Sequence, residues 1–375
     1  MTDSIADKMQ QGVDEGVFPG AVLLVEHKGK RVHHAAYGHA CLLPERVPAT
    51  VDTIYDLASL TKPIATATAV ALLVADGKLG LDDPLERYVP ELTQDALRRA
   101  TVRHLLNHSS GLPAWRPFYE RIVPNGRKLR EQPLLSRRAA IYDAIHRESL
   151  TEPVGGRCVY SDLGFLLLGE ILERIVKQEW SAFVHGEVFP WLGARDMFYM
   201  GEDGPTGGVS IAGRQFAATE QDDWRGRMIR GEVHDENAAV MGGVSAHAGL
   251  FGTAVAVARA VGPWLAAVRG DASSIPAPWA REFVRKQGID LQGSWALGWD
   301  TPSTGPGGTP SSSGSHFSPG SFGHLGYAGT SVWIDPERDL IVVLLTNRVH
   351  PTRKNDRIRA FRPAIHDVVF KSVVK

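Results

Sequence analysis

The chain has 375 residues, enough for about two domains of ordinary size or one large domain with a sizeable core. Its 41 lysines and arginines balance 42 aspartates and glutamates, so no net charge is present to attract nucleic acid or an anionic membrane. The two cysteines, Cys41 and Cys158, are too few for a disulfide framework.

The first segment, residues 1–20, lacks the basic and then apolar pattern of a signal peptide. No apolar run approaches the length of a membrane-spanning helix. We therefore expect a cytoplasmic protein, or a periplasmic one if a leader precedes this sequence. Residues 3–16 predict an amphipathic helix, and residues 21–37 hold two β-rich runs around a Lys-Gly-Lys turn, which indicates a hairpin.

A serine and a lysine three residues apart, Ser59 and Lys62, open an apolar stretch. Residues i and i+3 lie on one face of a helix, so the lysine can reach the serine hydroxyl. The helical spacing of the apolar residues predicts one buried face, and burial would lower the pKa of Lys62 and keep it neutral as a base. Because Pro63 is tolerated only in a first turn, the helix is expected to begin close to Ser59.

Two other patterns are interpreted as having no catalytic or metal-binding role. Ser372 and Lys375 repeat the serine–lysine spacing at the C-terminus, where chains are usually frayed and a lysine would stay charged. His104 and His108 have the i, i+4 spacing of zinc-binding helices, but Leu105 stands where the H-E-x-x-H motif has its glutamate. We interpret these histidines as packing or capping residues, and we expect no metal and no cofactor.

A tyrosine in a Gly-rich turn, Tyr160 of Tyr160-Ser161-Asp162, is the best candidate for a second proton carrier. A phenol near a lysine ammonium can have its pKa lowered towards neutrality. The alternative interpretation is that Asp162 caps the following helix, which ends near Gln178, while the tyrosine packs.

Three His-x-Gly sequences begin at His27, His247 and His324. The first falls on the early hairpin turn, and the second precedes a helix in a Gly-rich loop. We favour His324, because it opens a strand where Gly326 would let substrate approach the backbone, and the N–H of Tyr327 could point at an oxyanion.

The region from residue 231 to 243 concentrates polar residues at His234-Asp235-Glu236-Asn237. It is either a substrate-binding or metal-binding loop or a loop that caps the next element. The following residues, 243–247, miss the G-x-S-x-G nucleophile elbow at the last position, which argues against an α/β-hydrolase.

The rest of the C-terminal half alternates helix, loop and strand. Residues 253–268 predict an apolar helix, and the Gly-, Pro- and Ser-rich residues 301–323 predict a mobile surface loop. Strand, turn and strand are expected over 321–347, followed by an amphipathic helix from about residue 356.

In this order, SLTK at 59–62, YSD at 160–162 and HLG at 324–326 resemble the serine β-lactamase and penicillin-binding-protein superfamily, in particular class C β-lactamases, D-stereospecific peptidases and family VIII esterases. The resemblance covers most of the chain. It implies an α+β fold, with an antiparallel sheet flanked by helices and an inserted helical domain. The implied division is a sheet domain of residues 1–58 and 205–375 and a helical domain of residues 59–204, with the active site at their interface.

The resemblance also implies roles for individual residues. Ser59 would be the acylated nucleophile, Lys62 its base partner and Tyr160 the tyrosine of the family's Tyr-x-Asn element. His324 would replace the lysine of Lys-Thr-Gly, and the N–H groups of Ser59 and Tyr327 would bind the oxyanion.

Two residues depart from the family pattern in ways that bear on substrate. Asp162 replaces the asparagine, so an amide donor for a substrate carbonyl becomes an acceptor. Leu325 replaces a hydroxyl residue that would hold a β-lactam carboxylate, and a mostly neutral His324 grips a carboxylate less firmly than a lysine. The changes at Asp162 and Leu325 argue against an efficient β-lactamase.

We therefore expect a serine hydrolase that forms an acyl-enzyme on Ser59 and cleaves an ester or a peptide-like amide. The alternatives are a β-lactamase or D,D-carboxypeptidase, and a non-catalytic scaffold that keeps the fold. The expected partner is a small-molecule substrate, with neither nucleic acid nor membrane; the sequence specifies neither the substrate nor the oligomeric state.

Overall fold

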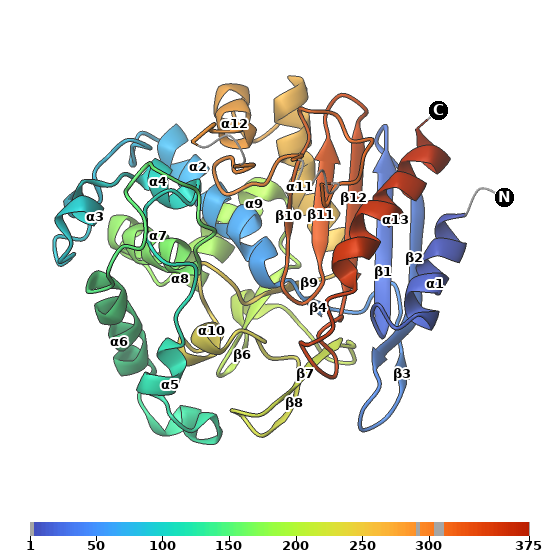
Figure 1. Ribbon diagram of the computed structural model, residues 1–375, viewed down its shortest axis with the longest axis horizontal. Helices are drawn as coiled ribbons and strands as arrows, with labels where there is room; N and C mark the ends of the chain where they lie inside the picture. Colours follow the sequence, from blue (N-terminus) through green and yellow to red (C-terminus); the bar gives the residue numbers. More distant parts are fainter. Residues whose placement is uncertain (1–3, 290–292, 304–310, 375) are drawn as a thin grey trace.

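A computed structural model describes residues 4–289, 293–303 and 311–374 of the chain. Its centre is an antiparallel six-stranded sheet in the order β10-β11-β12-β1-β2-β3, so that strands from both ends of the chain lie side by side (Figure 1). The strands are β1 (Gly20–His27), β2 (Lys30–Cys41), β3 (Val47–Pro48), β10 (Phe322–Leu325), β11 (Ser331–Asp335) and β12 (Leu340–Thr346). The expected fold class is confirmed, as are the first hairpin and the C-terminal strands.

The central strand β1 is buried on both faces because every residue of its first part is apolar and side chains alternate across a sheet. Ala21, Leu23 and Val25 pack in one core, whereas Val22 and Leu24 point into a second, larger core. The sheet therefore separates two hydrophobic layers, and the larger one carries the site described below.

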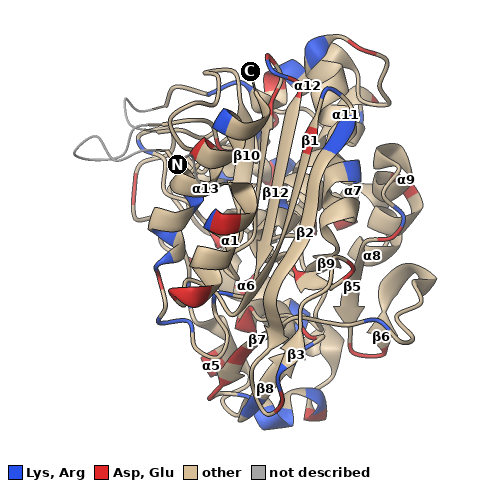
Figure 2. Ribbon diagram, turned by 90° about the vertical axis from the view of Figure 1, so that its right-hand side faces the viewer, with Lys and Arg blue, Asp and Glu red and all other residues tan. Residues whose placement is uncertain are grey.

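Helices from opposite ends of the chain cover one face of the sheet, α1 (Ile5–Asp14) and α13 (Ile358–Val373). In Figure 2 they lie on one side of the strands, and α8 (Trp180–Phe183) and α9 (Phe189–Leu192) lie on the other. The side chain of Ser4 caps α1 by accepting a hydrogen bond from the N–H of Asp7. On the second face, α11 (Ala254–Arg269) packs on β1 and β12. All three helices match the sequence-based expectation.

Most of the remaining helices are formed by the part of the chain that precedes residue 200 (Figure 1). They are α2 (Thr68–Ala75), α3 (Asp95–Arg99), α4 (Val102–Leu106), α5 (Phe118–Ile122), α6 (Leu134–His146), α7 (Asp162–Val176), α8 (Trp180–Phe183), α9 (Phe189–Leu192), α10 (Glu236–Val240) and α12 (Ala277–Val284). Two smaller sheets complete the fold. The first contains, in order, β4 (Tyr55–Asp56), β9 (Leu250–Gly252), β5 (Phe198–Gly201) and β6 (Gly204–Pro205). The second pairs β7 (Ala218–Asp222) with β8 (Arg227–Arg230). The division into two domains stays a prediction.

The apolar stretch around Ser59 forms one helical segment that changes type along its length. It begins as a 3-10 turn at Ala58–Leu60, continues as a π-helix at Lys62–Ala67 and ends as α2. The expected single buried face is wrong: residues 60–71 are buried all round, because α7 and α12 also pack on the segment. Residues 58–75 are long and apolar enough for a membrane span, contrary to expectation, but 83% of this window is buried inside the protein.

The Gly- and Ser-rich region near residue 310 differs from the expected mobile surface loop. Residues 304–310 lie outside the described residues, but Ser313, Ser318 and Ser321 are buried. The hydroxyl of Ser318 donates a 2.7 Å hydrogen bond to the Asp335 carboxylate, which ties this part of the loop to β11.

Candidate active site

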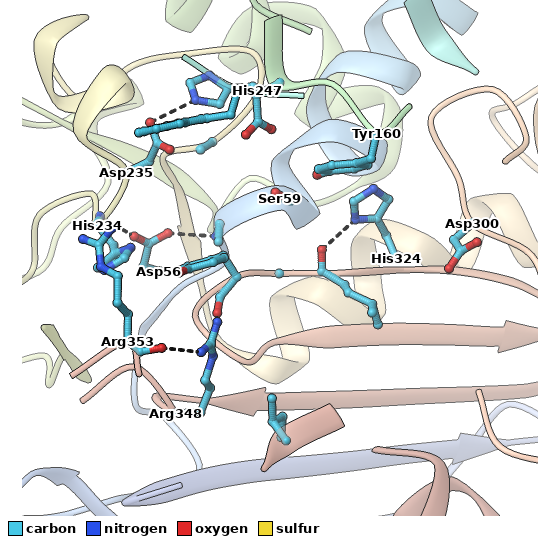
Figure 3. Close-up of a pocket in the computed structure, with 18 of the residues that line it drawn as sticks. Asp56, Ser59, Tyr160, His234, Asp235, His247, Asp300, His324, Arg348 and Arg353 are labelled. Atoms are coloured by element: carbon cyan, nitrogen blue, oxygen red, sulfur yellow. Dashed lines mark hydrogen bonds and ion pairs between the residues drawn. The ribbon is translucent and has the colours of Figure 1, made fainter. Parts of the chain in front are cut away.

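Ser59 lies on the wall of a cavity of about 680 Å³ (Figure 3). The turn before it is held by Asp56, whose carboxylate accepts hydrogen bonds from the N–H of Ala58 at 2.8 Å and of His234 at 2.7 Å. Burial raises the pKa of Asp56. Ala58 has a φ of 49°, which residues other than glycine rarely adopt. The serine therefore stands on a tightly fixed turn at the start of its helix.

The amine of Lys62 is fully buried, hydrogen-bonds to the Tyr160 phenol and contacts three further acceptors. Its Nζ lies 3.1 Å from Oγ of Ser59, 2.9 Å from the carbonyl oxygen of His247 and 2.6 Å from Oδ1 of Asp162. Burial acts to lower the pKa of Lys62, but Asp162 and Tyr160 raise it above its ordinary value. The expected contact with Ser59 is present, whereas the expected neutral lysine is wrong, because the carboxylate outweighs the desolvation.

Tyr160 packs against the same amine, with Nζ of Lys62 5.0 Å from its ring centre. The ring also contacts His108 and Trp295, at centroid distances of 4.6 and 5.1 Å. Burial raises the pKa of the Tyr160 phenol, although Lys62 opposes this shift. The expected lowering of the phenol pKa is therefore wrong, and Tyr160 keeps its proton.

Asp162 is the first residue of α7, and the helix cap is Ser161, whose Oγ accepts a hydrogen bond from the N–H of Gly164. The alternative of a capping aspartate is therefore wrong. The Asp162 carboxylate lines the cavity with 18% of its side chain exposed, and it forms the ion pair with Lys62. A residue expected only to face substrate thus also determines the charge of the lysine.

His324 and Leu325 line the cavity from β10, and His324 lies on the same side of Ser59 as Tyr160 (Figure 3). Burial and the nearby Lys62 lower the pKa of His324 to about 3, so the ring is neutral. Its Nδ1 lies 2.8 Å from the Leu325 carbonyl, to which it donates. The expectation of a mostly neutral histidine is confirmed.

Gly326 is required by close packing of the protein itself. A Cβ atom here would lie 2.0 Å from Oγ1 of Thr330 and 2.7 Å from the carbonyl oxygen of Leu57. The expected reason, an approach by substrate, is therefore incomplete, because the turn after β10 packs against the segment that carries Ser59.

The two N–H groups expected to bind an oxyanion belong to Ser59 and Tyr327, which both line the cavity. Within the described part of the chain, neither N–H donates to a backbone carbonyl. The Tyr327 ring is half exposed, stacks on His234 at 5.7 Å and lies 4.6 Å from the Arg348 guanidinium. The contacts of its ring hold Tyr327 in place, while the N–H groups of Ser59 and Tyr327 remain available to a ligand.

His247, which we set aside in favour of His324, also lines the cavity. Its carbonyl holds Lys62, its Nε2 lies 3.0 Å from Oδ1 of Asp235, and its Nδ1 lies 2.7 Å from Oγ of Ser245. Ser245 is 1% exposed, so substrate cannot reach it. Ser245 and His247, from the near-miss Gly-x-Ser sequence and the second His-x-Gly motif, thus support Lys62. The first His-x-Gly motif lies away from this contact, with His27 at the end of β1.

The polar loop between residues 231 and 243 contributes to the cavity and also caps a helix. His234, Asp235 and Glu236 line the cavity, and Asp235 accepts a hydrogen bond from the N–H of Ala238 at the start of α10. Asn237 instead bonds to the backbone of the 116–119 segment. Over residues 4–289, 293–303 and 311–374, no group of three or more His, Cys, Asp or Glu could hold a metal ion.

Four arginines that no motif indicated also line the cavity: Arg348, Arg353, Arg359 and Arg362. Arg353 forms ion pairs with Glu220 and Glu236. The buried Arg348 and Arg362 donate to carbonyl oxygens, and among the described residues neither has a carboxylate within ion-pair distance. Burial and the neighbouring Arg348 lower the pKa of Arg362 to about 9. Arg348 and Arg362 therefore bring positive charge to one part of the cavity, which Asp356 also lines.

Comparisons with protein families, related sequences and solved structures agree with one another. Residues 5–364 match the family described as Beta-lactamase. The chain is 30% identical over 370 residues to an Escherichia coli K12 protein provisionally named D-alanyl-D-alanine carboxypeptidase, covering 91% of this chain and 81% of the relative. It is 31% identical over 371 residues to the N-acetylmuramyl-L-alanine amidase of Bacillus subtilis, covering 92% and 81%. A class C β-lactamase structure from Rhodobacter sphaeroides superposes with a TM-score of 0.68 at 19% identity, covering 97% and 99%.

Proposed function

The chain belongs to the β-lactamase family, and we propose that it is a serine hydrolase that forms an acyl-enzyme on Ser59 and cleaves a peptide-like amide or an ester. The observation that carries the proposal is the 3.1 Å contact between Oγ of Ser59 and Nζ of Lys62 at the wall of a large cavity. A serine becomes a useful nucleophile only beside a group that takes its proton.

The remaining steps use groups that already surround Ser59. Oγ attacks the substrate carbonyl, and the free N–H groups of Ser59 and Tyr327 bind the developing oxyanion, commonly the largest single contribution to catalysis. Tyr160, which keeps its proton and lies beside Lys62, passes a proton to the leaving group. Water then hydrolyses the acyl-enzyme by the reverse proton path.

An amide is favoured over a β-lactam as the bond that is cleaved. Leu325 offers no hydroxyl, and the neutral His324 offers no charge, to a carboxylate beside β10. The names of the relatives, a carboxypeptidase and an amidase, support an amide. Arg348, Arg359 and Arg362, which have no ion-pair partner among the residues that the structure describes, support a substrate with a negative group at their end of the cavity.

The test is intact-protein mass spectrometry after incubation with D-alanyl peptides, muramyl peptides, short-chain esters and β-lactams. We expect an acyl adduct on the wild type and none on Ser59→Ala, with faster turnover of amides or esters than of nitrocefin. Tyr160→Phe should fold and acylate slowly.

A fluorophosphonate probe checks the nucleophile separately. Labelling should be absent in Ser59→Ala and retained in Ser245→Ala, whose hydroxyl is buried. The reverse pattern would make Ser245 the nucleophile. Failure of every probe on the wild type would favour the non-catalytic scaffold.

A further inference from the structure

Lys62 is positively charged in the resting site, because its contact with Asp162 outweighs its burial. A protonated amine cannot take the proton of Ser59, so it must first give a proton to a neighbour. Besides the Tyr160 phenol, its Nζ contacts three acceptors, and of these the Ser59 hydroxyl and the His247 carbonyl cannot hold an additional proton at neutral pH. The Asp162 carboxylate can.

The other titratable groups near Lys62 are poor acceptors. Tyr160, just before α7, already has its proton. His108, after α4, and His324, on β10, have pKa values lowered by burial and by Lys62 itself. The ring of His247 faces Asp235 and Ser245. Asp162, 2.6 Å away, is therefore the base that the geometry offers to Lys62.

We propose that Asp162 is a catalytic residue that takes a proton from Lys62 when substrate covers it, and so frees the amine to activate Ser59. The inference rests on the proposed function. It gives Asp162 a chemical role that an asparagine at this position cannot perform, because an amide does not accept a proton at neutral pH.

The proton steps balance. An N–H bond of Lys62 breaks and an O–H bond forms on Asp162, which converts the ion pair into a neutral pair. The amine then takes the Ser59 proton as Oγ attacks the carbonyl. When the tetrahedral intermediate collapses, Lys62 passes that proton through Tyr160 to the leaving group, and Asp162 returns its own proton to Lys62.

Substrate binding provides the trigger. Lys62 is already fully buried, so a ligand cannot desolvate it further, whereas 18% of the Asp162 side chain is exposed to the cavity. A ligand that displaces water from this carboxylate disfavours its charged form. Two buried charges are costly in a dry site, so the neutral pair becomes more accessible when substrate is bound.

The experiment measures the acylation rate by rapid fluorophosphonate labelling of the wild type, Asp162→Asn, Asp162→Ala and a control, Asp203→Asn, which changes an exposed aspartate of the β5–β6 turn. Asparagine keeps the shape and an acceptor oxygen but cannot take the proton. We expect Asp162→Asn to fold and acylate about 10²- to 10⁴-fold more slowly at saturating probe. The control should equal the wild type.

Chemical rescue separates proton transfer from simple positioning. Formate should accelerate acylation of Asp162→Ala, and formamide, of similar shape, should not.

Normal acylation by Asp162→Asn, or equal rescue by formate and formamide, would overturn the inference. Ser59→Ala decides the proposed function independently: if it loses labelling while Asp162→Asn keeps the full rate, the serine mechanism stands and the role of Asp162 fails.

Discussion

Nε2 of His247 lies 3.0 Å from Oδ1 of Asp235, while the carbonyl of the same histidine accepts a hydrogen bond from Lys62. The same aspartate caps α10 through the N–H of Ala238. The position of the lysine therefore depends on a side-chain contact that is remote from it in sequence. This support connects the stability of the 234–247 region to the chemistry of Ser59.

Removing the Asp235 carboxylate should lower both stability and activity. Asp235→Ala removes a helix cap, which is typically worth about 1 kcal/mol, and leaves a buried histidine nitrogen unpaired, at a cost of about 1–3 kcal/mol. Asp235→Asn should lose less, because asparagine also caps helices. Urea unfolding should rank the wild type above Asn and Asn above Ala. An alanine variant as stable as the wild type would show that this contact contributes nothing.

The acid stability of the protein should depend on Glu220. Burial opposes its ionisation, but hydrogen bonds from His234 and Arg353 lower the pKa of Glu220 from 4.5 to about 2. A carboxyl with a lowered folded-state pKa stabilises the protein above its unfolded-state pKa, and this stability is lost as the pH falls through the folded value.

The unfolding free energy of the wild type should therefore decrease between pH 4.5 and 2, and that of Glu220→Gln should decrease less. Denaturant titrations at several pH values measure the difference between the two proteins. Asp235, whose pKa is also lowered, is present in both and cancels. Parallel curves for the two proteins would contradict the prediction.

The main features of the fold and the catalytic centre could be predicted from local sequence. Alternating or continuous apolar runs predict β1 and the C-terminal strands. Ser59, Tyr160 and His324 stand in short motifs with their own flanking elements, and the structure brings them to one cavity.

The rest depends on contacts between distant segments. The charge of Lys62 was mispredicted because burial can be estimated from an apolar helix, whereas the opposing carboxylate lies a hundred residues away on α7. The unpaired arginines were missed because most arginines are exposed and paired, and only the folded chain shows which ones lack a counter-ion.

The positive part of the cavity should favour anionic substrates. Arg359 is exposed at its edge, so Arg359→Ala should reduce kcat/KM for a substrate that carries a carboxylate about two- to five-fold, the size of an exposed ion pair. The matched carboxamide should be unaffected, and added salt should diminish the difference. Arg357→Ala, which removes a neighbouring exposed arginine bonded to the Glu15 carbonyl, is the control. Equal losses for both substrates would argue against an anion at this end.

Gly326→Ala should damage the oxyanion donors more than the fold. The new Cβ would lie 2.0 Å from Oγ1 of Thr330 and 2.7 Å from the carbonyl oxygen of Leu57, so the turn after β10 must shift. Overpacking typically costs about 1–3 kcal/mol, and loss of one oxyanion donor about 10²- to 10³-fold in rate. Because the adjacent N–H belongs to Tyr327, we expect kcat to fall by about that factor with KM little changed.

Gly186→Ala is the matched control, because a Cβ at this exposed position of the helical segment Val184–Val188 meets nothing within 4 Å. It should keep full activity and be at least as stable as the wild type, since alanine favours a helix over glycine. Steady-state kinetics and thermal unfolding of the two variants together test the assignment. If Gly326→Ala retained the wild-type kcat, the N–H of Tyr327 would not be an oxyanion donor, because that backbone cannot stay in place beside the added methyl group.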